Sequence, residues 1–233
     1  MPPILSIIIP ALNEESALPA TLAALAAQAP HPWRVELILA DGGSTDRTVE
    51  LAGAAGAAVV IANPGRGPQM RAGAAAATGE VLMFLHADVC LPPTALAAVS
   101  NALEAAEACA GCFAVVHQCS TAASPLTRRF IRLADKRSRT RALPYGDQAL
   151  FCTRVMYDQV NGIPAVPLME DVAFARALQQ HTEIVRLPLA VVTSARRFEK
   201  RPIRTTLCWW TFPLLARWGV KPKTLAKLYG RSN

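Results

Sequence analysis

The chain has no apolar run long enough to cross a membrane, since every such run is broken before the roughly 18–20 continuous apolar residues that a spanning helix needs. It also lacks the basic stretch that opens a signal peptide: the start is Met-Pro-Pro, and the first apolar run breaks at Pro10 and then at Glu14. Six cysteines among 233 residues do not suggest a disulfide scaffold. We therefore expect a cytoplasmic protein.

Basic residues are scarce in the first half of the chain. Residues 1–119 hold 4 Lys and Arg against 10 Asp and Glu, whereas residues 120–233 hold 20 against 7. An acidic half followed by a basic half indicates two tasks, the first suited to a cation and a nucleotide and the second to an anionic partner. The chain shows no nucleic-acid recognition motif with interleaved aromatic residues, so we expect no nucleic-acid partner.

Three apolar runs in the first 90 residues each end in a carboxylate cluster. The runs 5–12, 35–40 and 81–85 lead to Glu14, Asp41 and Asp88. Short apolar runs separated by helical stretches indicate buried parallel strands joined by crossover helices, and ligands of such sheets bind outside the carboxyl ends of the strands. Acids in that crevice suit hydroxyls, base edges or a cation rather than bare phosphate. The pattern therefore predicts an α/β fold with a nucleotide-sugar site.

The remaining elements follow from hydrophobic periodicity and turn residues. We predict helices over 16–28, 44–52, 69–77 and 93–106, and strands over 57–61, 110–117, 148–152 and 184–193. Ser44 is expected to cap the second helix, and Ser124-Pro125 to open a basic amphipathic helix. Pro188 is expected to interrupt the last strand. Glu170 is expected to begin another helix.

A cysteine-rich stretch offers one alternative site. Cys109, Cys112, His117 and Cys119 have a spacing that could hold zinc. The stretch alternates as a strand, however, and a strand points successive side chains to opposite faces. We therefore favour a strand over a zinc site.

Four motifs in fixed order make the sequence recognisable. They are Ile7-Ile-Ile-Pro-Ala-Leu-Asn-Glu14, Asp41-Gly-Gly-Ser-Thr-Asp46, Gly79-Glu-Val-Leu-Met-Phe-Leu-His-Ala-Asp88 and Glu170-Asp171. Each is weakly specific alone, but the four at these spacings resemble family 2 inverting glycosyltransferases of the GT-A fold over roughly residues 4–200. The run Ser194-Ala-Arg-Arg-Phe-Glu199 and the compact length resemble a small bacterial subgroup named for arsenosugar biosynthesis.

The resemblance implies a domain organisation. Residues 1–200 would form a GT-A-like, Rossmann-like α/β domain whose mostly parallel sheet is flanked by helices. Residues 1–119 would be its nucleotide and metal half, and residues 120–200 its acceptor half. Residues 201–233 would form a basic, tryptophan-rich helical appendage.

The resemblance also implies the donor contacts, which are Pro10, Leu12, Glu14, Asp41, Arg71, Ala87 and Asp88, with Arg196 and Arg197 near the diphosphate. Asp41 would hold the base and Glu14 the ribose and base, since a carboxylate accepts the N–H donors of uracil or guanine. Asp41 could instead only form a turn before Gly-Gly, and Arg71 could be an ordinary surface residue.

A divalent cation at Asp88 is a further implication. Mg²⁺ is usually held by one or two carboxylates together with phosphate oxygens. Where the family usually has Asp-x-Asp, this chain has His86-Ala87-Asp88. One carboxylate is thereby lost, so we expect either weak binding of the cation or a preference for Mn²⁺, which tolerates imidazole better than Mg²⁺ does. The alternative is a strand-end aspartate that binds nothing.

Asp171, beside Glu170, matches the family's catalytic base, because an inverting transfer must remove a proton from the acceptor hydroxyl. Both acids could instead be ordinary first-turn residues that complement a helix dipole. Gly146, Asp147 and Gln148 match the acceptor side. The sequence leaves the acceptor open between a small molecule and a lipid phosphate, and an already ionised phosphate would need no base.

The tail contains an uncharged run, residues 205–216, that holds Trp209 and Trp210 and has basic flanks. It is too short to span a bilayer. Residues 201–228 could contact a membrane surface peripherally, pack on the domain or form a homodimer contact.

The sequence thus predicts an inverting, metal-assisted transferase that uses a nucleoside-diphosphate sugar, UDP- favoured over GDP-, in the cytoplasm or at the inner face of the membrane. One alternative is a sugar nucleotidyltransferase, but such an enzyme normally has a Gly-rich loop and a lysine after the first strand, where this chain has Pro10 to Glu14. The other is a catalytically idle nucleotide-binding or membrane-bound scaffold, suggested by His86 in place of the first acid.

Overall fold

The computed structural model describes residues 2–105, 108–121, 123–140, 143–164, 166 and 168–200, and single positions beyond them at 203, 205–207, 211, 215, 220 and 224. Within those ranges the side chains of Ala105, Arg197 and Lys200 are not described. The expected appendage over 201–233, with its membrane segment 201–228, therefore lies almost wholly outside the described residues.

One sheet of eight strands organises the chain, in the order β3-β2-β1-β4-β7-β6-β8-β5. The strands are β1 (Ile4–Ala11), β2 (Arg34–Asp41), β3 (Ala58–Ile61), β4 (Val81–Phe84), β5 (Val89–Cys90), β6 (Ala110–Gln118), β7 (Phe151–Thr153) and β8 (Ile184–Ser194). Pairing is parallel between β1 and β2, β1 and β4, β2 and β3, and β6 and β8. It is antiparallel where β7 meets β4 and β6 and where β5 meets β8.

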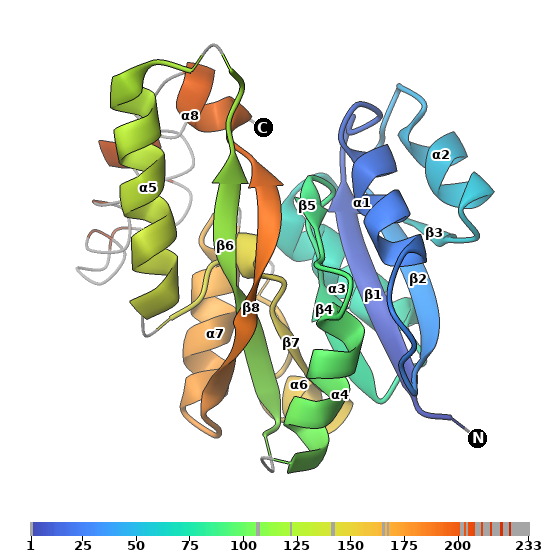
Figure 1. The fold of residues 1–233 in the computed structure, drawn as a ribbon. Helices are drawn as coiled ribbons and strands as arrows, with labels where there is room; N and C mark the ends of the chain where they lie inside the picture. Colours follow the sequence, from blue (N-terminus) through green and yellow to red (C-terminus); the bar gives the residue numbers. More distant parts are fainter. Residues whose placement is uncertain are drawn as a thin grey trace.

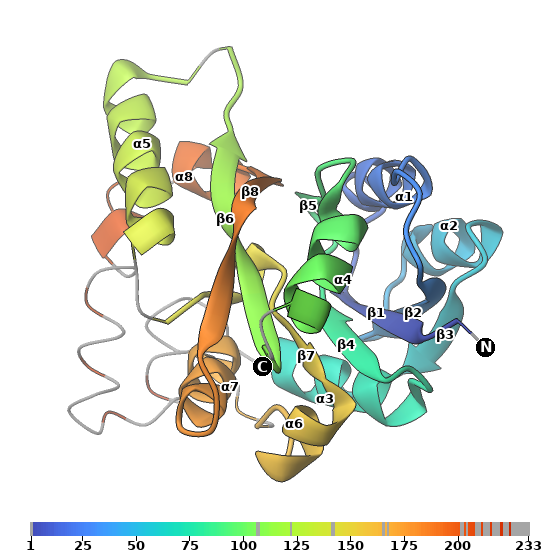
Figure 2. The same cartoon turned by 60° about the horizontal axis from the view of Figure 1, so that its bottom comes forward.

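Helices cover both faces of this sheet (Figure 1 and Figure 2). They are α1 (Leu18–Ala26), α2 (Thr48–Ala54), α3 (Arg66–Ala76), α4 (Ala95–Ala105), α5 (Pro125–Thr140), α6 (Arg154–Gln159), α7 (Glu170–Gln179) and α8 (Arg196–Lys200), with a 3₁₀ turn, η1, at Gly146–Gln148. In Figure 2, α1 and α2 lie on the opposite side of the strands from α3 and α6. The mixed α/β fold predicted from the sequence is confirmed.

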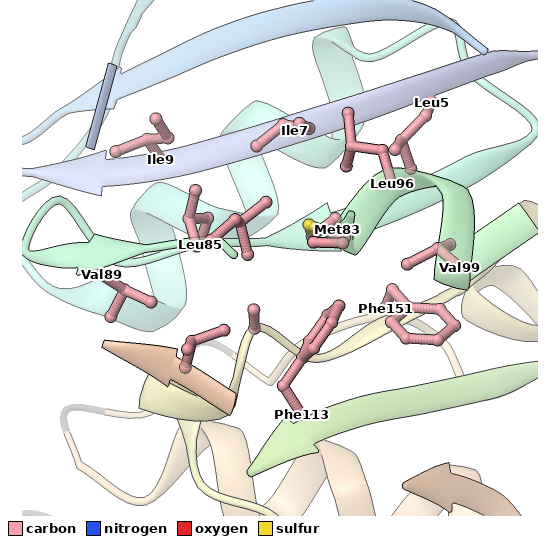
Figure 3. Close-up of a cluster of buried hydrophobic side chains, with 14 of the residues drawn as sticks. Leu5, Ile7, Ile9, Met83, Leu85, Val89, Leu96, Val99, Phe113 and Phe151 are labelled. Atoms are coloured by element: carbon pink, nitrogen blue, oxygen red, sulfur yellow. The ribbon is translucent and has the colours of Figure 1, made fainter. Parts of the chain in front are cut away.

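Strand β1 explains why both faces must be covered. Leu5, Ile7 and Ile9 belong to one apolar cluster, together with side chains of α1, α2 and α4 (Figure 3). Ile8 belongs to a second cluster, with side chains of α3, α6 and α7. All four are fully buried, as expected for a near-continuous apolar strand in the centre of an α/β sheet.

Strand order positions the candidate site. The chain leaves β1 to one side for β2 and β3, and later returns to the other side for β4. The carboxyl ends of β1 and β4 thus border the point where the strand order reverses, which is where open α/β sheets bind ligands.

Two local predictions need correction, and a third is confirmed. The helix expected from Ser44 begins only at Thr48, because Ser44 bonds to other partners in the loop. The strand expected over 148–152 is shorter, since residues 146–148 form the 3₁₀ turn η1. The interruption expected at Pro188 is confirmed: the register with β6 shifts between Cys112, opposite Arg186, and Ala114, opposite Ala190, and β8 then continues to Ser194.

Among the residues that the structure describes, no helix is both long enough and apolar enough to cross a bilayer.

The predicted helix cap at Ser124 is present: its Oγ accepts a hydrogen bond from the backbone N–H of Thr127 at 3.1 Å.

Candidate active site

Hydrogen bonds join the loop after β1 to the loop after β2. The backbone N–H of Asn13 donates to Ser44 Oγ at 2.9 Å, and Asn13 Oδ1 accepts from the backbone N–H of Thr45 at 2.9 Å. The backbone N–H of Glu14 donates to Thr48 Oγ1 at 2.8 Å. Asn13 adopts a left-handed φ of 55°, which asparagine tolerates better than most residues. These bonds fix the positions of both acidic loop ends relative to each other.

Asp41 holds its own turn. The residue is 2% exposed, and its Oδ2 accepts from the backbone N–H groups of Gly43 and Ser44, each at 2.9 Å. Its Oδ1 accepts from Ser44 Oγ at 2.5 Å. Asp41 therefore stabilises the turn before Gly-Gly, which was the alternative role left open by the sequence. Both of its carboxylate oxygens, at the end of β2, have hydrogen-bond partners within the protein.

Arg196 connects the acid after β1 with the acid after β4. Its Nη2 donates to Glu14 Oε1 and Oε2 at 2.9 and 2.7 Å, and to Asp88 Oδ2 at 3.2 Å. Desolvation opposes the charged form, but the bonds to Glu14 and the charge of Asp88 outweigh it and raise the pKa of Arg196. The sequence predicted Arg196 near a diphosphate; the structure places it between two carboxylates.

Strand pairing explains how residue 196 reaches residue 88. β5 begins immediately after Asp88 and runs antiparallel to the end of β8, with Val89 opposite Thr193. β8 ends at Ser194 and α8 begins at Arg196. Figure 1 shows α8 at the end of β8. The pairing of the two-residue strand β5 with the end of β8 thus brings Arg196 to Asp88.

Gly146 lies close to both His86 and Asp171. A methyl group at position 146 would lie 2.7 Å from His86 Nε2 and 3.1 Å from Asp171 Oδ2. The backbone N–H of Gly146 donates to Asp171 Oδ2 at 2.7 Å, while Asp171 Oδ1 accepts from the N–H of Val172. The absence of a side chain at Gly146 therefore lets a candidate metal ligand, His86, and the candidate base, Asp171, both approach this backbone segment. Glu170, at 2% exposure, is buried at the start of α7.

Asp147 belongs to a cluster that the sequence did not identify. His117 Nδ1 lies 2.6 Å from Asp135 Oδ1, and His117 Nε2 lies 3.9 Å from Asp147 Oδ2. Burial raises the pKa of Asp147, the charge of His117 opposes this, and the charge of Asp171 adds to it. Asp147 Oδ1 is buried without a hydrogen-bond partner among the described residues. His117 and Asp135 come from β6 and α5, and no sequence spacing links them to Asp147.

Gln148 has a different environment from its neighbours. It is fully buried, its Nε2 donates to the carbonyls of Phe113 and Ser138 at 2.7 and 3.3 Å, and its Oε1 accepts from the N–H of Tyr145 at 3.0 Å. Its amide therefore stabilises the turn that carries Asp147 and, in this arrangement, does not face an acceptor.

The other predicted donor contacts are scattered. Pro10 and Ala87 are buried, Ala87 accepting a bond from Thr21 Oγ1 at 2.8 Å, whereas Leu12 is 44% exposed. Arg71 is exposed on α3 and donates to the carbonyl of Ile163 at 3.3 Å, which ties it to the loop before α7. The side chain of Arg197 lies outside the described part of the chain.

Gln69 was missed by the sequence reasoning. It is 3% exposed, and its Nε2 donates to the carbonyls of Ala11 and Ala40 at 2.6 and 2.9 Å. One side chain thus joins the ends of β1 and β2. A glutamine in the second turn of a helix gives no sequence signal for such a role.

The side chains of residues 86–88 could hold a hard cation only if a bound diphosphate supplied further oxygen ligands. No group of three or more His, Cys, Asp and Glu side chains able to hold a metal occurs within the described ranges. Asp88 supplies one carboxylate and the buried His86 one imidazole, so phosphate oxygens of a bound diphosphate would have to complete the coordination of Mg²⁺ or Mn²⁺.

Known proteins resemble this chain in sequence and in fold. An uncharacterized glycosyltransferase of Mycobacterium tuberculosis (strain ATCC 25618 / H37Rv) is 38% identical over 84 residues, which cover 36% of this chain and 36% of that protein. The matched stretch thus spans about a third of the relative.

Two solved structures share the fold. TarS residues 1–349 of S. aureus in complex with UDP-GlcNAc gives a TM-score of 0.61 at 16% identity, covering 82% of this chain and 58% of that chain. The mannosyltransferase PcManGT of Pyrobaculum calidifontis, in complex with GDP-Man and Mn²⁺, gives 0.64 at 18% identity, covering 89% and 61%. At these identities the likeness supports the GT-A fold alone.

The model of the family described as "Glycosyl transferase family 2" matches residues 6–159, well over half of the chain. This stretch runs from within β1 to the end of α6 and therefore includes Glu14, Asp41 and Asp88. The resemblance to the arsenosugar subgroup stays a prediction. The chain belongs to glycosyl transferase family 2, as its four motifs predicted.

Proposed function

We propose that this enzyme transfers a sugar from a nucleoside-diphosphate sugar, UDP- favoured over GDP-, to an acceptor by an inverting, metal-assisted single displacement. One observation supports this most strongly. Arg196 joins Glu14 to Asp88 at the edge where β1 and β4 end. Glu14, proposed to bind the nucleoside, and Asp88, proposed to bind the cation, therefore lie close together.

Donor binding would use the loops after β1, β2 and β4. Asp41 would accept a hydrogen bond from the base and Glu14 from the ribose, as carboxylates do. Asp41 would then have to share its oxygens with the turn that it now holds. Arg196 and Arg197 would bind the diphosphate, with Arg71 against the base or diphosphate and Pro10, Leu12 and Ala87 lining the site.

Asp88 and His86 would hold Mn²⁺ or Mg²⁺ together with the diphosphate oxygens. The cation, when bound, neutralises the charge that develops on the leaving diphosphate. The protein's own contribution is a fixed carboxylate at the end of β4 and a cationic side chain, Arg196, directly beside it.

Asp171 would take the proton of the acceptor hydroxyl as that oxygen attacks the sugar. Its Oδ2 already accepts a hydrogen bond from Gly146 N–H, which fixes the carboxylate toward the turn 146–148. Buried Glu170 would support Asp171 at the start of α7. Asp147, in the turn 146–148, would contact the acceptor.

The acceptor is a small molecule or a lipid phosphate, and α5 favours the second. This helix exposes Arg129, Arg132 and Lys136. Leu126 and Leu133 lie on the same face and are 50% and 44% exposed. A basic helix face with apolar side chains suits an anionic membrane surface, from which a lipid phosphate could be reached.

A thermal-shift panel tests the proposal: UDP, GDP, CDP, ADP and TDP, each with and without Mn²⁺ or Mg²⁺. A ligand at about 100 times its Kd stabilises the protein by about 2.7 kcal/mol, or roughly 5–10 °C for a chain of this size. We expect a metal-dependent rise with UDP that Asp88→Ala abolishes. No response to any diphosphate would overturn the proposal, and binding without turnover across several acceptors would favour an idle scaffold.

A further inference from the structure

The guanidinium of Arg196 lies at the position where the proposed function needs a cation. A single nitrogen, Nη2, contacts both oxygens of Glu14 and one oxygen of Asp88, at 2.7–3.2 Å. The side chains are only partly exposed, at 33% for Arg196, 20% for Glu14 and 17% for Asp88. Water therefore screens these charges less than it would on an open surface.

The two carboxylates need such a partner. Glu14 and Asp88 end adjacent segments of one sheet, and like charges that close are costly unless a cation lies between them. Among the described residues, the ion pairs at Glu14 and Asp88 are both made by Arg196. A metal ion that binds Asp88 must therefore compete with Arg196 for the same carboxylate.

A diphosphate changes this competition. Phosphate oxygens are strong partners for a guanidinium, which binds them in the same fork geometry as a carboxylate. When cation and diphosphate arrive together, the cation can take Asp88 while the diphosphate offers Arg196 a replacement for the bonds that it loses. When the cation arrives alone, Arg196 has no replacement and the exchange is unfavourable.

We propose that Arg196 is a resident counter-ion of the donor site, which the cation and the diphosphate displace together by moving it from Glu14 and Asp88 to the phosphate oxygens. The proposal deepens the proposed function and rests on it for the identity of the ligands. Arg196 thereby couples the two binding events. Coupling is reciprocal, so the diphosphate strengthens cation binding by the same factor as the cation strengthens diphosphate binding.

The test measures Mn²⁺ binding to the protein alone, by the electron paramagnetic resonance signal of free Mn²⁺. Wild type is compared with Arg196→Gln, which keeps polarity but removes the charge, and with Arg196→Lys, which keeps the charge. Arg47→Gln is the matched control, because Arg47 also pairs with a carboxylate, Glu50 at 2.8 Å, but on an exposed surface. Circular dichroism melts establish that each variant folds.

We expect Arg196→Gln to bind Mn²⁺ about fivefold or more tightly than wild type, a typical lower bound for coupled sites. Arg196→Lys and Arg47→Gln should stay near wild type, and adding Asp88→Asn to Arg196→Gln should remove the gain. Unchanged or weaker Mn²⁺ binding by folded Arg196→Gln would overturn the proposal, and so would a gain that survives Asp88→Asn.

A second arm repeats the titrations with UDP, or with whichever diphosphate stabilises the protein. In wild type, Mn²⁺ should strengthen diphosphate binding by a larger factor than in Arg196→Gln. An equal factor in both would overturn the coupling. Failure of every diphosphate to bind wild type would instead contradict the proposed function, while the Mn²⁺ arm would still report on the competition at Asp88.

Discussion

At the scale of single residues, Asp147 is a carboxylate whose surroundings favour its protonated form. Burial raises its pKa and Asp171 adds to this effect, so the folded protein binds a proton there more readily than the unfolded chain does. A group of this kind stabilises the fold at low pH and loses that contribution as pH rises through its folded pKa. Charge on Asp147 is thus a cost to stability at neutral pH, as is common at functional sites.

Asp147→Asn should therefore change how stability depends on pH. Relative to wild type, the variant should gain stability as pH rises above about 3.9, the ordinary aspartate pKa, and the gain should level off above the folded pKa. Urea unfolding of both proteins between pH 4 and pH 8 measures this. A difference that is constant with pH, or that shrinks as pH rises, would contradict the assignment.

Gly146 carries a second residue-scale prediction. Gly146→Ala places a methyl group 2.7 Å from His86 Nε2, and such overpacking should cost about 1–3 kcal/mol of stability and lower activity. Gly53→Ala is the matched control, because nothing lies within 4 Å of its added methyl group in α2. That variant should gain about 0.5–1 kcal/mol. Chemical denaturation compares the two, and equal effects would disprove the close contact.

Replacing Asp171 should slow the chemical step without weakening donor binding. Asp171→Asn should lower turnover by about 10²–10⁴-fold, the usual contribution of a general base. Its thermal shift with diphosphate and Mn²⁺ should match that of wild type, because Asp171 is proposed to contact the acceptor. Steady-state kinetics with an identified acceptor hydroxyl measures the loss. Full activity would point to an acceptor that is already ionised, such as a phosphate.

At the scale of secondary-structure elements, α5 is the clearest candidate for partner binding. Each Lys or Arg near an anionic membrane surface contributes about 1 kcal/mol. Replacing Arg129, Arg132 and Lys136 by Gln should therefore weaken binding to phosphatidylglycerol vesicles by about 100-fold. A control with Arg34, Arg47 and Arg176 replaced by Gln makes the same charge change elsewhere on exposed positions. Equal loss in both in a vesicle flotation assay would show that net charge, not α5, matters.

The elements that the sequence predicted well are those with strong periodicity. β1 and β4 are apolar runs buried on both faces, and β2 is buried over its second half. The ends of all three lie within a residue or two of the predicted ones. The prediction of the start of α2 was wrong because more than one polar side chain in the preceding loop can cap a helix. Ser44 is a good helix cap in principle, but its hydroxyl bonds to Asp41. Asp46 Oδ1 accepts from the N–H of Thr48 instead, at 3.0 Å, at the start of α2.

At the scale of the whole molecule, the acids were predictable and their partners were not. Glu14, Asp41 and Asp88 end predicted strands, so sheet topology alone brings them to one edge. Arg196 lies 182 positions from Glu14 in the sequence. Its placement depends on the pairing of β5 with β8, and β5 is a two-residue strand that the sequence does not signal. The pairing of His117 with Asp135 likewise depends on α5 packing against β6.

Residue, element and whole molecule meet in the proposed event at Asp88, where a cation and a diphosphate bind and move Arg196. Crystals of the protein with Mn²⁺ and the stabilising diphosphate test it most directly, through an anomalous difference map. We expect a manganese peak at Asp88, the diphosphate beside it, and Arg196 bonded to phosphate and no longer to Glu14. A bound diphosphate with Arg196 still on both carboxylates, or manganese away from Asp88, would contradict it.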